Sequence, residues 1–171
     1  MQLWVNLPSH LKFTPPRYQP LTGDHLTLLT SPDGGALVRL IAGELDGHQG
    51  PGDTHTPITY AHVTLSPGAQ LTVPWNPAFN AMAYTLLGRG YVGEEQRPLS
   101  AHELAVFGPG DTVTVRAREG DDEPLDVLLL GGLPIREPIA HYGPFLMNTK
   151  AQILEAIDDF NAGKMGTIPT T

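Results

Sequence analysis

Short apolar segments, separated by glycine and proline turns at fairly regular intervals, constrain the fold of this chain more than any other feature. The segments are rich in β-branched or aromatic residues and span 59–65, 69–73, 81–87, 104–107, 112–117 and 127–130. The turns between them are Pro67-Gly68, Gly88-Arg89-Gly90, Pro109-Gly110-Asp111 and Glu119-Gly120-Asp121. This spacing is typical of antiparallel strands and argues against βαβ units. The sequence therefore predicts an all-β sandwich or barrel.

The size and composition of the chain agree with one compact domain. A length of 171 residues lies in the usual range of single domains. The 19 glycines and 17 prolines leave little room for long helices, while 40% hydrophobic residues suffice for a core.

Charge and residue types exclude several functions. The formal net charge of −8 argues against direct binding to nucleic acid, because phosphate contacts depend on clustered Lys and Arg. The absence of cysteine excludes disulfides, thiolate chemistry and cysteine-ligated zinc, and it is compatible with the cytoplasm, where we place the chain. No stretch approaches ~18 consecutive apolar residues, and the N-terminus lacks a basic region followed by an apolar core. We expect neither a membrane span nor an export signal.

One helix is predicted, over residues 150–162. Thr149 and Gln152 have the spacing of a capping box, and Gly163 is placed to end the helix. The apolar stripe on one face of this helix is formed by Ile153, Ile157 and Phe160. Just upstream, Arg136 and Glu137 stand between two prolines. We expect them to fix the connection from the last strand to the helix by ion pairs or backbone hydrogen bonds.

Two long segments carry a resemblance to a known family. Residues 3–19 contain LWVNLP and KFTPPRYQ, and residues 131–148 read GGLPIREPIAHYGPFLMN. Both segments resemble the pirin family, whose members are two-domain cupins, and the match runs nearly end to end. The first segment resembles the stretch just upstream of the second pirin cupin. The resemblance therefore implies the C-terminal cupin of a pirin-like bicupin, with the N-terminal cupin absent.

The fold implied by this resemblance is a cupin double-stranded β-helix, a jelly-roll barrel, with one C-terminal α-helix. We expect an interdomain-type strand and linker over residues 1–20, the barrel over 21–147, and the helix and tail over 148–171.

The resemblance also implies where a metal would be held. Active cupins hold a metal with a His-x-His pair on one strand and a further His and a carboxylate nearby. No His-x-His occurs in this chain. Alignment of the segments 83–90 and 107–115 with the two family motifs puts four other residues at the ligand positions, which are Pro74, Asn76, Val113 and Val115. We predict an interior without metal or other cofactor, closed by side chains, and no catalytic residue in this chain alone.

Four residues cluster in sequence near the lost metal motif: Trp75, Asn76, Phe79 and Tyr84. They could line a pocket for a small organic ligand, with Trp75 as the stacking surface and Asn76 as the polar anchor. The alternative is that these aromatic residues only fill the barrel. We favour the second interpretation from the sequence, because small barrels are usually packed with side chains.

Two other patterns have structural explanations. His48, His55 and His62 recur every seven residues, but this interval has no geometric meaning outside a helix, so we expect no metal site there. Residues 88–93 match a dinucleotide-binding glycine motif, but the residues that follow, 94–98, include two glutamates and a proline rather than a helix start. A β-hairpin is predicted instead.

Two hypotheses for the function follow. The first is a non-catalytic, metal-free cupin module that acts through protein docking or small-ligand binding. The alternative is a part of a metal-dependent pirin-type quercetin 2,3-dioxygenase, or of a redox regulator, whose active cupin is supplied by another chain. Under either hypothesis, we expect the alternating segment 3–7 to pair with a second copy in a homodimer or with a separate N-terminal cupin chain.

Overall fold

The computed structural model describes residues 2–167 and divides them into two compact units. The larger unit runs from Leu21 to Pro134, and the smaller one combines the ends of the chain, up to Pro20 and from Ile135. None of the helices within residues 2–167 has the length and apolarity needed to cross a membrane.

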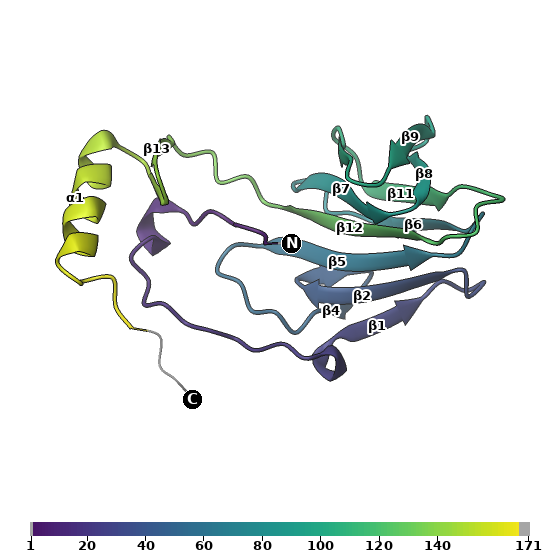
Figure 1. The fold of residues 1–171 in the computed structure, drawn as a ribbon, viewed down its shortest axis with the longest axis horizontal. Helices are drawn as coiled ribbons and strands as arrows, with labels where there is room; N and C mark the ends of the chain where they lie inside the picture. The colour runs from purple at the N-terminus through teal and green to yellow at the C-terminus, as the bar shows by residue number, and fades with distance from the viewer. Residues whose placement is uncertain (1, 168–171) are drawn as a thin grey trace. The chain divides into compact units, whose positions relative to one another are not determined.

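The larger unit is a sandwich of two antiparallel sheets (Figure 1). The six-stranded sheet contains, in spatial order, β1 (Thr27–Thr30), β2 (Ala36–Ala42), β5 (Ile58–Leu65), β12 (Leu125–Gly132), β7 (Asn80–Leu87) and β10 (Leu104–Val106). The four-stranded sheet contains β6 (Gln70–Pro74), β11 (Thr112–Ala117), β8 (Arg89–Val92) and β9 (Arg97–Ser100). A small hairpin of β3 (Glu44–Leu45) and β4 (His48–Gln49) and a 3-10 turn, η2 (Gly23–His25), complete the unit.

Alternating side chains build the core between the two sheets. In β5 every second residue is buried, from Thr59 to Leu65, and β11 buries Val113, Val115 and Ala117 in the same way. Apart from Thr59, these residues belong to one continuous apolar cluster that joins both sheets. The period of two is what a sheet with one buried face requires, and it confirms the predicted all-β sandwich.

The predicted strand segments are all strands in the structure, but the prediction was incomplete. The structure adds β1 and β2 to the sandwich, and it places the hairpin β3–β4 inside residues 43–56, which the sequence suggested were a loop. The glycine motif at 88–93 lies on the hairpin of β8 and β9, as predicted, and not before a helix.

The smaller unit contains the 3-10 turn η1 (Ser9–Leu11), the hairpin β13 (Ala140–Tyr142) and β14 (Phe145–Met147), and the helix α1 (Lys150–Asn161). The capping box is confirmed, because Gln152 N donates to Thr149 Oγ1 at 3.2 Å and Thr149 N donates to Gln152 Oε1 at 3.0 Å. The apolar stripe differs from the prediction. Ile153 and Ala156 are buried, whereas Phe160 is 62% exposed and only touches Phe145 edge-on.

The N-terminal segment does not form the predicted strand. Residues 2–8 are extended without strand pairing, and η1 follows directly after Pro8. The segment is held within the smaller unit by Glu137, which accepts hydrogen bonds from the Ser9 N and Oγ at 2.8 and 3.2 Å and from Asn148 Nδ2 at 2.8 Å. Glu137 thus has the expected role in fixing the approach to the helix.

The boundary of the sandwich also differs from the expected one. We expected the barrel to extend to residue 147, but residues 135–147 pack with the helix and with residues 2–20. Pro134 and Pro138 explain this boundary, because proline lacks the N–H that a continued ladder would need.

Candidate functional site

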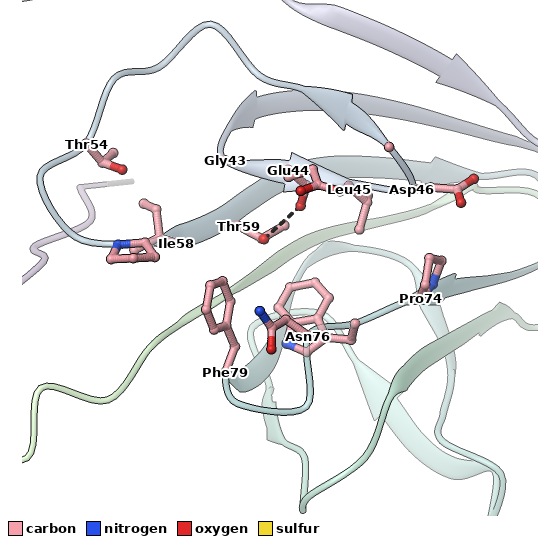
Figure 2. Close-up of a pocket in the computed structure, with 13 residues that line it drawn as sticks. Gly43, Glu44, Leu45, Asp46, Thr54, Ile58, Thr59, Pro74, Asn76 and Phe79 are labelled. Atoms are coloured by element: carbon pink, nitrogen blue, oxygen red, sulfur yellow. Dashed lines mark hydrogen bonds between the residues drawn. The ribbon is translucent and has the colours of Figure 1, made fainter.

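A cavity of about 540 Å³ opens at the end of the sandwich where β6 finishes and β5 and β7 begin. One wall is the β3–β4 hairpin with the start of β5, and the other is the segment from Pro74 to Phe79 that follows β6. Figure 2 shows side chains from both walls turned toward the same space. The cavity therefore lies wholly within the larger unit.

Trp75 provides the apolar floor of the cavity. Its side chain is only 7% exposed, its backbone N donates to Asp111 O at 2.7 Å, and its indole Nε1 donates to Asn80 O at 3.3 Å. The indole lies close to Gly131, where an added Cβ would stand 2.9 Å from Trp75 Cζ2. A buried indole with its N–H bonded is rigid, so this wall is preorganised.

Asn76 is oriented by a tight turn. Its Oδ1 accepts from Ala78 N at 2.9 Å, and its backbone O accepts from Phe79 N at 2.9 Å. Asparagine followed by Pro77 suits such a turn, because asparagine bonds the backbone two residues on and proline presets φ. With Oδ1 engaged, the amide nitrogen is turned toward the cavity beside Phe79 (Figure 2).

The β3–β4 hairpin forms the opposite wall and is fixed to β5. Thr59, which is buried, donates from Oγ1 to Glu44 O at 2.9 Å, the contact drawn in Figure 2. Gly43 permits the close approach, since an added Cβ would lie 1.7 Å from Ile58 O. The hairpin turns at Asp46 and Gly47, both with positive φ of 49° and 75°, a pair that suits tight hairpins.

The charge around the cavity has one sign. Glu44 and Asp46 contribute two carboxylates to its lining, and no Lys, Arg or His side chain is among the described residues that line it. Both acids are exposed, so their field acts at the mouth rather than in the interior. The site therefore favours neutral or positively charged molecules over anions.

The structure brings together three of the four predicted pocket residues. Trp75, Asn76 and Phe79 line the cavity, but Tyr84 does not. Tyr84 alternates to the outward face of β7, because its neighbours Ala83 and Thr85 are the buried residues of that strand. Sequence reasoning missed Glu44 and Asp46, although the Asp46-Gly47 pair is a hairpin signal.

The residues at the four predicted ligand positions do not fit a transition metal. Pro74 and Asn76 border the cavity but are exposed, while Val73 and Trp75 occupy the inward positions of that segment. On the facing strand, Val113 and Val115 are 2% and 0% exposed within the apolar core. Iron, nickel or zinc sites need imidazole, carboxylate or thiolate ligands, which these positions lack.

No other described part of the chain replaces that ligand set. Among residues 2–167, no group of three or more His, Cys, Asp or Glu side chains is arranged to hold a metal ion. This includes His48, His55 and His62, whose regular spacing brings no cluster together.

Comparison with known proteins assigns the chain to a family. Residues 60–166 match the model of the pirin C-terminal cupin domain. The chain belongs to the pirin family. A pirin-like protein of Solanum lycopersicum is 38% identical over 167 residues, covering 97% of this chain and 56% of that protein. A putative quercetin 2,3-dioxygenase of Vibrio cholerae is 36% identical over 171 residues, covering 97% of this chain and 58% of that protein.

A solved structure supports the same assignment for the fold. The crystal structure of quercetin 2,3-dioxygenase from Acinetobacter baumannii superposes with a TM-score of 0.86 at 35% identity, covering 96% of this chain and 56% of that one. The sandwich is thus a cupin fold, as expected. The pirin-family chain spans little more than half the length of the relatives described here.

Proposed function

We propose that this pirin-family chain is a metal-free cupin module that binds a small, neutral or cationic organic molecule in the cavity between the β3–β4 hairpin and Trp75. The observation that carries the proposal is the lining itself. A rigid aromatic floor and an oriented amide line one space with two exposed carboxylates at its mouth, while the positions expected for metal ligands hold apolar or exposed residues.

The dimensions and chemistry of the cavity define the ligand class. A volume of about 540 Å³ lies within the range of small-molecule sites, about 300 to 1,000 Å³. Trp75 and Phe79 offer aromatic surface to a planar molecule, and the Asn76 amide nitrogen donates to a carbonyl or hydroxyl oxygen. Glu44 and Asp46 accept hydrogen bonds from hydroxyl or ammonium groups and repel carboxylates and phosphates.

Quercetin is the probe suggested by the names of the relatives. It is planar and carries several hydroxyl donors and a carbonyl acceptor, so it matches both aromatic walls and both kinds of polar group. Isothermal titration calorimetry of the metal-depleted chain would rank the affinities of three compounds: quercetin, a protonated aromatic amine and an aromatic carboxylate. We expect measurable binding of at least one of the first two and none of the carboxylate.

A matched pair of variants locates the binding. Phe79→Ala removes a cavity wall and should weaken binding at least about fivefold, which corresponds to roughly 1 kcal/mol. Phe160→Ala removes the same side chain from an exposed site on α1 and should leave binding unchanged. Equal affinities of both variants, or preferred binding of the carboxylate, would contradict the proposal.

A second candidate is participation in quercetin oxygenation. It is favoured by the names of the Vibrio cholerae and Acinetobacter baumannii relatives, of whose lengths this chain covers 58% and 56%. Since residues 2–167 lack a fitting ligand set, the metal would have to be held by another chain or segment. Oxygen uptake with quercetin by the chain alone should equal that of buffer, and uptake well above buffer would favour this second candidate.

A further inference from the structure

The cavity beside Trp75 combines aromatic surface inside with negative charge at its mouth. Glu44 and Asp46 lie on the hairpin wall, and Asn76 and Phe79 lie on the facing wall (Figure 2). Phe79 is half-buried and packs against the apolar core, as the ring of a fixed wall does. The faces of aromatic rings are electron-rich, so they attract a cation, as carboxylates do. A positive charge is therefore favoured both at the mouth and at the floor.

The hairpin brings no fixed positive charge to this mouth. Residues 44–49 contain no Lys or Arg, and their one basic side chain is that of His48. Its ring Nδ1 donates to Asp46 O at 2.8 Å, so this nitrogen bonds the hairpin backbone, and His48 does not line the cavity. The two carboxylates thus act without a compensating side chain in the described lining.

The polar groups around the floor are already paired. Asn76 Oδ1 accepts from Ala78 N at 2.9 Å, and Asn76 O accepts from Phe79 N at 2.9 Å. Asn80 O accepts from the Trp75 indole Nε1 at 3.3 Å. An ammonium group with N–H donors would lose water at this floor and find few free acceptors, which weakens binding. A cation whose nitrogen is fully alkylated has no N–H to leave unpaired.

We infer, on the basis of the proposed function, that the small molecule bound in this cavity is a quaternary ammonium compound. Its alkylated nitrogen packs on the rings of Trp75 and Phe79, within the field of Glu44 and Asp46. A hydroxyl or carbonyl oxygen elsewhere in the molecule accepts from the Asn76 amide nitrogen, which faces the cavity (Figure 2).

The expected advantage of the positive charge has two parts. A cation at an aromatic face gains about fivefold in affinity over a neutral group of the same shape. Exposed carboxylates such as Glu44 and Asp46 add about threefold, because water screens them. We therefore expect an advantage of at least about tenfold at low ionic strength, and a smaller one in about 0.5 M NaCl, where the carboxylates are screened further.

Isothermal titration calorimetry with three para-substituted benzyl alcohols tests this ligand class. The three compounds carry a trimethylammoniomethyl, an aminomethyl or a neopentyl group, so the first and third share one shape and differ in charge. The trimethylammonium compound should bind at least about tenfold more tightly than the neopentyl compound, and more tightly than the aminomethyl compound. Equal affinities of the first and third compounds, or tightest binding of the aminomethyl compound, would overturn the inference.

A pair of double variants locates the charge effect. Glu44→Gln with Asp46→Asn should reduce the advantage of the trimethylammonium compound at least about threefold. Both residues hold the hairpin through backbone oxygens, and asparagine accepts the positive φ of position 46 as readily as aspartate, so this variant should fold. The salt dependence of the native chain gives the same information without any substitution.

The matched control is Asp122→Asn with Glu123→Gln, which removes the same two charges from exposed positions in the larger unit. These residues precede β12, whereas Gly131, near the other end of that strand, lies against Trp75. The control should keep the full advantage, and an equal loss in both double variants would overturn the inference. Binding of quercetin or the neopentyl compound without any preference for the cation would leave the proposed function standing. If none of these compounds bound, the proposed function would fail as well.

Discussion

Gly131→Ala should destabilise the larger unit strongly, because the cavity floor depends on a glycine at this position. An added Cβ would lie 1.8 Å from Asn80 O and 2.9 Å from Trp75 Cζ2. The oxygen belongs to the backbone of β7, which pairs with β12 at this point, so it cannot rotate away. Relief requires a shift of about 1.5 Å between two strands that normally lie about 4.8 Å apart.

The magnitude follows from the contacts that this shift disrupts. Overpacking in a well-packed core destabilises by about 1 to 3 kcal/mol, and a lost hydrogen bond adds about 1 kcal/mol. The hydrogen bond at risk joins Trp75 Nε1 to Asn80 O. We therefore expect a loss of roughly 2 to 4 kcal/mol, a large part of the stability of a typical domain, about 5 to 15 kcal/mol.

Equilibrium denaturation in guanidinium chloride, followed by tryptophan fluorescence, measures this loss. Gly108→Ala is the matched control, because an added Cβ there meets no atom within 4 Å. The control should change stability by less than about 0.5 kcal/mol, as surface substitutions usually do. If Gly131→Ala were as mild as Gly108→Ala, the close approach of β7, β12 and Trp75 would be refuted.

Three further outcomes are expected. Thr149→Ala should destabilise α1 by about 1 kcal/mol through loss of its N-cap. Phe160→Ala should have a smaller effect, because that ring is exposed. Thermal melts of the two variants would compare their losses of stability. The hydrogen bond from the Ser9 backbone N–H lowers the pKa of Glu137, and the hydrogen bond from Asn148 adds to the effect. The stability that this contact provides is therefore fully present above the usual carboxyl pKa, and it is lost as pH falls through the lowered pKa. Melting temperatures of the native chain and Glu137→Gln should therefore converge in acid. Metal analysis after dialysis should find far less than one equivalent of iron, nickel, manganese or zinc. A stoichiometric amount of any of these metals would contradict the conclusion that the residues at the four expected ligand positions do not bind a transition metal.

The sequence predicted strands best where burial alternates. The pattern of β5 and β11 shows their period of two directly, whereas β2 reads ALVRLIA, a nearly continuous apolar run that periodicity alone cannot assign. The two-residue strands β3 and β4 are too short to show any period. For this reason the hairpin that carries one wall of the cavity was missed.

The errors at the site and at the N-terminus have a common physical cause. Tyr84 is close to Trp75 in sequence, but the parity of its strand turns it to the other face of the sheet. Leu3, Val5 and Leu7 alternate as a strand would, yet alternation needs a neighbouring strand to become a ladder. Strand pairing across the whole sheet decides which face a residue lies on and which neighbours it contacts. The local sequence does not contain this information.

The most direct test of metal-free ligand binding is an NMR titration of the EDTA-dialysed chain with quercetin, followed through its two tryptophan indole N–H signals. Trp75 forms the cavity floor, while Trp4 is 72% exposed in the smaller unit and serves as an internal control. We predict a saturable shift of the Trp75 signal that needs at least about fivefold more quercetin in Phe79→Ala, with the Trp4 signal unchanged. Equal shifts of both signals, or a Trp75 shift that appears only after iron, nickel or manganese is added, would contradict the account.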